Sequence, residues 1–276
     1  MRLAALVAQQ LRVLVCEAAG RVLRRSSVRS LPVGDEEAAV RIQQKLQEAF
    51  VLPADLAPGT FTGRLLIDDE SGRSEVPFSF EIYTPDVIPT DFARAVFLAS
   101  HVSESDQLRS FAAEALSEGP LSPQQTAEQL FLALCGRHLR YQPPVSTKYP
   151  DCQRVSPVSY VLSGGGSCAD LSLLYASLLW VRGLSPVLLL FPEHMTAGLL
   201  VEDPDPQFET LDDAGVMVRM IEEGRLFVPE LTDVCAGDAI SAEASAARTA
   251  GKLRSGSAPC RLVNIRQVLR SGTAVS

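Results

Sequence analysis

The sequence predicts an α+β protein in which one buried helix packs against an antiparallel sheet. The helix is expected within SGGGSCADLSLLYASLLWVRG (163–183), where apolar side chains occupy almost every turn. At least four short apolar runs follow it, and runs of that length bounded by turn residues are typical of strands. Because several strands follow a single helix in succession, the sheet should be antiparallel.

The composition is that of an ordinary globular protein. The chain has 276 residues, 46% of them hydrophobic, which is enough for a sizeable core. Its formal net charge is −8, and no cluster of Lys and Arg is interleaved with aromatic residues, so a nucleic-acid partner has no support. No segment contains the 18 or so uninterrupted apolar residues that a membrane-spanning helix needs.

An N-terminal helical region is predicted over residues 1–52. Residues 1–24 fit an amphipathic helix, 26–34 a linker and 35–50 a second helix. The first segment also has the positive start and short apolar run of an export signal. Polar residues interrupt that run and no small-residue cleavage site follows, so a cytoplasmic location is expected, with export as the alternative.

A small β-rich unit is predicted over residues 53–103. The runs FTGRLLI and EVPFSFEIY lie on either side of a turn cluster at 68–73, and Phe78, Phe80 and Ile82 alternate with polar residues. This alternation predicts a β-hairpin. Residues 96–100 are expected to add a short strand.

The rest of the chain, 104–276, is predicted to be one domain. Helices are expected at 103–116 and from Ser122 to residue 139, followed by a long proline-containing loop at 141–162. A structureless segment of this length is usually functional. After the central helix, SPVLLLF, HMTAGLLVE, GVMVRMI and RLFVPEL predict strands, the last two as a hairpin around 222–224. An alanine-rich helix, a loop and VNIRQVLR complete the chain.

Cys168 is the leading candidate for a reactive group. Three glycines precede Ser167, a residue type that caps helices, and Asp170 falls in the first turn. Cys168 would therefore lie where free backbone N–H groups and the positive end of the helix dipole stabilise a thiolate. The alternative interpretation is a buried structural cysteine, since free cysteine is often buried.

A nucleophilic thiol needs a base and a group that orients the base. Of the three histidines, His101 and His138 are more simply surface residues, whereas His194 begins the second strand after the central helix. Glu230 interrupts the apolar run LFVPEL and could hold the imidazole of His194, with Asp233 as the competing acid.

The cysteine pattern gives no indication of a metal site. The six cysteines include no C-x-x-C pair, and a site built from Cys152, Cys168, His194 and Cys235 would follow no known ligand spacing. Reduced thiols are the simpler expectation than disulfides. No dinucleotide or phosphate-binding glycine motif is present either, so no cofactor is expected.

Taken together, SGGGSCADLSLLYASLLWVRGLSP, FPEHM and RLFVPELT resemble the transglutaminase-like superfamily of cysteine enzymes, and bacterial members above all. The similarity is specific over 153–232, and a weaker one reaches back through 61–116. It implies a papain/transglutaminase-like core, with a nucleophilic cysteine at a helix start and an antiparallel sheet that supplies a histidine and an acid.

By this resemblance Cys168 is the nucleophile, His194 the base, Glu230 the orienting acid and Asp170 an aspartate that organises the core. The implied function is acyl transfer on a peptide, isopeptide or side-chain amide of a protein or peptide substrate. Hydrolysis is expected, with amine cross-linking left open. Gln153 and Gln142 are candidate donors to the oxyanion.

An inactive homologue is the alternative to an enzyme. Ser167, Glu193 and Phe227 differ from the residues common at these positions of the family, and these differences motivate a peptide-binding or scaffold domain without activity.

Overall fold

The computed structural model describes residues 8–16, 22–29, 59–69, 72–149, 151–201, 208–236, 240–256 and 258–271. The chain forms two compact units, Met1–Thr84 and Pro85–Ser276. The first unit therefore ends near residue 84, whereas the sequence predicts two separate regions here, a helical one over 1–52 and a β-rich one over 53–103. Each unit is described by itself.

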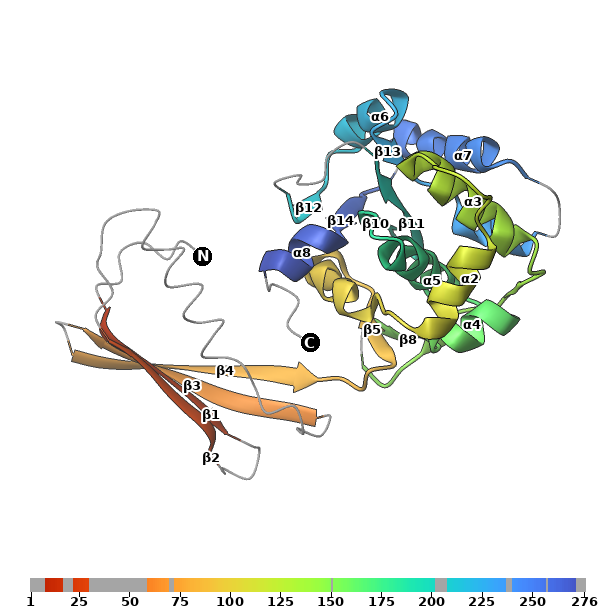
Figure 1. Cartoon of the computed structure of the whole chain (residues 1–276). Coiled ribbons are helices and arrows are strands. Elements are labelled where there is room, and N and C mark those ends of the chain that lie inside the picture. Colours follow the sequence, from red (N-terminus) through yellow and green to blue (C-terminus); the bar gives the residue numbers. More distant parts are fainter. Residues whose placement is uncertain are drawn as a thin grey trace. The chain divides into compact units, whose positions relative to one another are not determined.

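The N-terminal unit contains a four-stranded antiparallel sheet in the order β2-β1-β3-β4 (Figure 1). Its strands are β1 (Ala8–Cys16), β2 (Val22–Arg29), β3 (Gly59–Asp69) and β4 (Gly72–Ile82). The predicted hairpin is confirmed, because β3 and β4 pair along their whole length from Gly59↔Ile82 to Asp69↔Gly72.

The predicted helix over 1–24 is wrong, and so is the linker over 26–29, since β1 and β2 lie there. Leu11, Val13 and Val15 alternate with other residues, a period that suits a strand as well as a loose helix. Pairing with β3 across the sheet, for example Val13 opposite Leu65, decides between the two. The predicted helix at 35–50 lies outside the described residues.

The second unit is organised around a five-stranded sheet in the order β12-β14-β10-β11-β13, with all neighbours antiparallel. The strands are β10 (Pro186–Phe191), β11 (His194–Leu200), β12 (Thr210–Leu211), β13 (Leu226–Phe227) and β14 (Arg261–Asn264). This mixture of helices with an antiparallel sheet agrees with the predicted α+β class.

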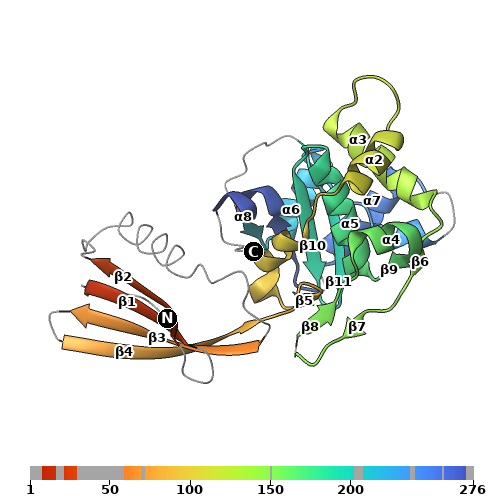
Figure 2. The same ribbon diagram turned by 60° about the horizontal axis from the view of Figure 1, so that its bottom comes forward.

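Helices surround this sheet, and α5 (Cys168–Val181) lies against β10 and β11 (Figure 2). The others are the 3₁₀ helices η1 (Phe92–His101) and η2 (Leu231–Cys235), and α2 (Asp106–Glu114), α3 (Pro123–Cys135), α4 (Val158–Gly164), α6 (Ala214–Glu222), α7 (Ala242–Ser255) and α8 (Ile265–Ser271).

Alternation along β10 covers both faces of the sheet. Leu188 and Leu190 belong to the core that contains α5, whereas Val187 and Leu189 pack with side chains of α6 and α7. Residues 168–179 of α5 are all buried. At about 2 kcal/mol for each fully buried leucine, this packing fixes the position of the helix more firmly than local propensity does.

Short strands replace the predicted loop at 141–162. β5 (Val87–Pro89), β7 (Val145–Ser146) and β8 (Cys152–Arg154) form a three-stranded sheet, while β6 (Arg140–Tyr141) pairs in parallel with β9 (Gly165–Gly166). The segment before the central helix is therefore held against the start of that helix.

Two predicted strands are helices instead. Residues 96–100 lie in η1, and GVMVRMI lies in α6, which Asp213 caps and which buries Met217 and Met220. The three-residue spacing of these methionines is helical, and it outweighs the strand preference of the intervening valines. The predicted helices at 103–116 and 122–139 are confirmed as α2 and α3, although α3 ends at Cys135.

None of the helices in the described part of the chain has the length and apolar character that crossing a bilayer requires.

Candidate active site

Cys168 is the first residue of α5, and a reciprocal pair of hydrogen bonds holds the helix start in place. Ser167 is the N-cap: its hydroxyl accepts from the Asp170 backbone N–H at 3.3 Å, and Asp170 Oδ2 accepts from the Ser167 N–H at 2.8 Å. Asp170 Oδ1 also accepts the backbone N–H of Ser156 at 2.6 Å. The buried Asp170 thus joins the start of α5 to the chain before α4.

The glycines before Cys168 are needed because other groups approach them closely. Gly165 has a φ of 91°, and a Cβ there would lie 2.1 Å from the Arg140 carbonyl oxygen. A Cβ at Gly166 would lie 2.5 Å from the Asp170 Cβ. Only glycine allows β9 to run beside β6 and then enter the capped helix.

His194 begins β11 and faces Cys168 from the sheet. It lies opposite Phe191 at the end of a tight β10–β11 connection, and the two rings stack with centroids 6.2 Å apart. The imidazole and the Cys168 thiol are close enough for each to shift the pKa of the other. Ser172 of α5 strengthens this junction, because its hydroxyl contacts the carbonyl oxygens of Cys168 at 2.6 Å and Met195 at 3.1 Å.

Glu230 lies beside His194, with 2.9 Å between His194 Nε2 and Glu230 Oε2. Its predicted position on a strand face is wrong, since β13 ends at Phe227 and Glu230 is the N-cap of η2. The chain leaves the sheet after two paired residues, so alternation no longer determines where the side chain points. The side chain of Glu230, one methylene longer than that of an aspartate, reaches the imidazole from this helix cap.

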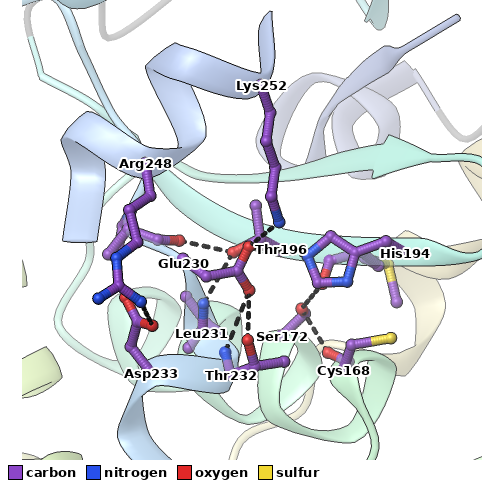
Figure 3. Close-up of polar contacts among 12 residues, drawn as sticks. Cys168, Ser172, His194, Thr196, Glu230, Leu231, Thr232, Asp233, Arg248 and Lys252 are labelled. Carbon is purple, nitrogen blue, oxygen red and sulfur yellow. Dashed lines mark hydrogen bonds and ion pairs between the residues drawn. The ribbon is translucent and has the colours of Figure 1, made fainter. Parts of the chain in front are cut away.

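Four donors hold the Glu230 carboxylate (Figure 3). Oε1 accepts from the backbone N–H of Thr232 at 3.2 Å and from its hydroxyl at 2.8 Å. Oε2 accepts from His194 and from Lys252 Nζ of α7. Because Nε2 faces Glu230, Nδ1 is the nitrogen left for the sulfur.

These contacts shift the pKa of each member of the group. Burial acts to raise the pKa of the Cys168 thiol, but hydrogen bonds from His194 and from the Met195 and Ala169 N–H groups lower it below its ordinary value. The hydrogen bonds to Cys168 and Glu230 raise the pKa of His194 to about 9. Burial opposes ionisation of Glu230, yet hydrogen bonds from His194 and Lys252 lower its pKa to about 2. The arrangement favours a thiolate, an imidazolium and a carboxylate in succession.

Tyr141 is a neighbour of Cys168 that the sequence did not indicate. It lies in β6 opposite Gly166, two residues before Cys168, and its side chain is half exposed. Burial, the charge of Cys168 and a hydrogen bond to Cys168 raise the pKa of the phenol, so the hydroxyl keeps its proton at neutral pH. The only local signal was an aromatic residue inside a segment that resembled a loop.

The other predicted support residues do not contact the sulfur. Gln153 lies in β8 opposite Ile88 and Ser146, and Gln142 donates its backbone N–H to the Gly166 carbonyl at 2.9 Å. Neither makes one of the hydrogen bonds that converge on Cys168, His194 or Glu230. Asp233, the competing acid, accepts instead from Arg248 at 2.6 Å.

The remaining histidines and cysteines lie elsewhere. His138 is exposed, and His101 is partly buried, which lowers its pKa. Cys135, Cys152, Cys168, Cys235 and Cys260 are free thiols. Over the described ranges, no group of three or more His, Cys, Asp or Glu side chains could hold a metal ion.

No protein-family model, no curated protein and no solved structure matches the chain. The resemblance to transglutaminase-like enzymes therefore stays a prediction, carried by the residues quoted above.

Proposed function

We propose that the chain is a thiol enzyme of transglutaminase-like type, which transfers an acyl group from a peptide, isopeptide or side-chain amide through Cys168, His194 and Glu230. The observation that supports this most directly is the place of the imidazole, which lies 2.9 Å from Glu230 through Nε2 and on its other side lowers the pKa of the Cys168 thiol. A cysteine kept only for packing would need no ionisable partners of this kind.

In the acylation step, the Cys168 thiolate attacks the carbonyl carbon of the amide and a C–S bond forms. The imidazolium of His194 gives its proton to the leaving nitrogen as the C–N bond breaks, which releases an amine. Glu230 holds the ring with Nε2 toward itself, so that Nδ1 stays on the side of the sulfur.

The negative charge that develops on the carbonyl oxygen needs a donor close to the sulfur. The phenol of Tyr141 is close enough to Cys168 for the thiol to raise its pKa, and the side chain is half exposed. We therefore assign the role of oxyanion donor to Tyr141 in place of Gln153 and Gln142. Loss of one such donor typically slows an acyl-transfer reaction by about 10²–10³.

In the second step, the neutral His194 takes a proton from water or from an amine, which attacks the thioester carbon. The C–S bond then breaks, and Cys168 leaves as the thiolate beside the imidazolium. Water gives hydrolysis, and a lysine amine gives a cross-link. The side chain of His194 is 22% exposed, so a nucleophile from solvent can approach the imidazole. Neither nucleophile is favoured by a feature of the described site.

The alternative is an inactive peptide-binding or scaffold domain of the same type. One observation favours it: Cys168 itself is only 5% exposed, which leaves little of the residue accessible to a substrate.

The experiment that tests the proposal is acylation by p-nitrophenyl acetate, followed by mass spectrometry of the intact chain and its peptides. A burst of nitrophenolate and an acetyl thioester on Cys168 are expected, and both should be lost in Cys168→Ser and strongly slowed in Tyr141→Phe. Decay of the thioester in buffer alone, compared with decay in the presence of a primary amine, separates hydrolysis from transfer. No thioester at Cys168 would favour the inactive domain.

A further inference from the structure

One face of α7 binds the segment that carries Glu230. Ser245, Arg248 and Lys252 are spaced three and four residues apart, so they share a face of the helix. Ser245 Oγ accepts from the Glu230 N–H at 2.8 Å and donates to the Glu230 carbonyl at 3.2 Å. Arg248 pairs with Asp233. Helix α7 thus fixes the backbone of Glu230 through Ser245, and the nearby Asp233 through Arg248.

Lys252 does something different, because it binds the reacting end of the carboxylate. Lys252 Nζ binds Oε2, the same carboxylate oxygen that His194 binds, and not Oε1. Thr232 already occupies Oε1 with two donors. The four donors together oppose rotation of the carboxylate away from the imidazole (Figure 3).

Sharing one oxygen also places a cation next to the imidazole. The charges alternate along the group: the Cys168 thiolate, the His194 imidazolium, the Glu230 carboxylate and the Lys252 ammonium. Lys252 acts to lower the pKa of both Glu230 and His194. A carboxylate that is partly neutralised by an ammonium attracts the imidazolium proton less strongly.

Among the residues that the structure describes, Lys252 is the cation placed to have this effect. Glu230 is faced by His194 from β11 and by Lys252 from α7, and Arg248 of the same helix is engaged by Asp233. On its other side His194 faces Cys168 of α5, beyond which lies Tyr141 of β6.

We propose that Lys252 is a positioning residue of this site, which holds the Glu230 carboxylate in line and limits how tightly that carboxylate keeps the proton on His194. This proposal rests on the proposed function. The effect of Lys252 matters in the second step of that reaction, when water or an amine attacks the thioester. After the thiolate has become a thioester, the imidazole must be neutral to accept a proton from water or an amine. A weaker pull from Glu230 makes the neutral ring available at lower pH.

The pair differs from an ordinary surface ion pair on the same helix. Lys252 is 47% exposed but its partner Glu230 is only 5% exposed, whereas Arg254 and Glu222 are 52% and 54% exposed. Exposed pairs contribute little because water and salt screen them. Arg254 is therefore a matched control for the loss of a cation from α7.

The test is a proton NMR titration of the His194 ring in the full chain, with Cys168→Ala in every variant so that neither thiolate nor catalysis contributes. Only three histidines need assignment, and His194→Gln identifies the signal. Lys252→Met should raise the pKa of His194 by about half a pH unit or more. Lys252→Arg, which keeps the charge, and Arg254→Met should both titrate close to the parent protein.

An unchanged His194 titration in Lys252→Met would overturn the proposal. So would an equal shift in Lys252→Arg or Arg254→Met, because the effect would then not come from a charge at this position. The measurement uses no substrate, so its result is independent of whether Cys168 forms a thioester.

Discussion

Cys168 and Cys135 lie in the same unit, one at the N-terminus of a helix and the other at the C-terminus of another helix. Cys168 is the first residue of α5 and Cys135 is the last residue of α3. Burial acts to raise the pKa of both thiols. At Cys135 nothing outweighs it, and the nearby Asp233 carboxylate adds to the effect, so its pKa is raised to about 11. Cys168 is buried whereas Cys135 is only partly buried, and yet the pKa of Cys168 is lowered.

The difference shows that burial alone does not determine whether a thiol ionises. The start of a helix offers free N–H groups, whereas its end offers carbonyl oxygens, and only the former stabilise an anion. The second requirement is a basic partner, which β11 supplies to Cys168 and no described element supplies to Cys135. The reactivity of Cys168 therefore follows from its position at the N-terminus of a helix and from the histidine that strand β11 places beside it.

The largest expected effect is selective alkylation. At pH 7 iodoacetamide should modify Cys168 at least about 100-fold faster than Cys135, because the thiolate is the reactive form. Peptide mass spectrometry at a series of times measures both rates in one sample. In concentrated urea, where the helix ends are lost, the two rates should converge. Similar rates in the folded protein would remove the distinction between the two sites.

Removing the carboxylate that caps α5 should weaken the structure that presents Cys168. Asp170→Ala leaves the donors of Ser156 and Ser167 without their buried acceptor, and we expect a loss of about 2 kcal/mol in the free energy of unfolding. The comparison at the helix that carries Cys135 is Ser122→Ala, which removes the N-cap hydroxyl of a more exposed capping box and should cost about 1 kcal/mol. Urea denaturation measures both. A smaller loss at Asp170 than at Ser122 would contradict this account of the helix start.

The acid should influence Cys168 only through His194. Glu230→Gln keeps the size of the side chain but removes the charge that favours the imidazolium, so alkylation of Cys168 at pH 7 should slow about 10-fold. The rate at Cys135 should not change. Glu222→Gln, which removes an exposed carboxylate, serves as the control. If it slows Cys168 as much, the effect is one of net charge.

The smallest expected effect concerns the turn before His194. Glu193 has a φ of 58°, a left-handed conformation that costs a residue with a Cβ roughly 1 kcal/mol. Glu193→Gly should therefore stabilise the protein by about 0.5 kcal/mol, after the greater flexibility of glycine in the unfolded chain is subtracted. Thermal unfolding measures it. A clear loss of stability would mean that the Glu193 side chain contributes contacts that outweigh the strain.

The sequence predicted the centre of the second unit better than its periphery. Helix α5 and strands β10 and β11 have strong local patterns, namely a glycine-serine start and apolar runs of strand length. The local pattern predicts a helix at β1 and a linker over the second half of β2, because β1 is fixed by pairing with β3, which is distant in sequence, and β2 by pairing with β1. Long-range pairing overrides local preference, and no local pattern reports it.

The candidate site shows the same limit. Cys168, His194 and Glu230 could be picked out because each breaks or begins a recognisable element. Tyr141 and Lys252 could not, since a two-residue strand and a surface helix bring them to the site from far along the chain. Glu230 was the right residue to place beside His194 but was expected on the wrong kind of element.

The central claim is that the imidazole of His194 keeps the Cys168 thiol ionised. It is tested most directly by the rate of Cys168 alkylation as a function of pH, in the wild-type protein and in His194→Ala. Because His194, whose own pKa is raised to about 9, lowers the pKa of the thiol, the wild-type rate should rise with pH at a lower pH than the rate in His194→Ala. In His194→Ala the rate at pH 7 should fall about 10-fold or more, and then rise with pH as an ordinary buried thiol ionises. Two coinciding profiles would contradict the account.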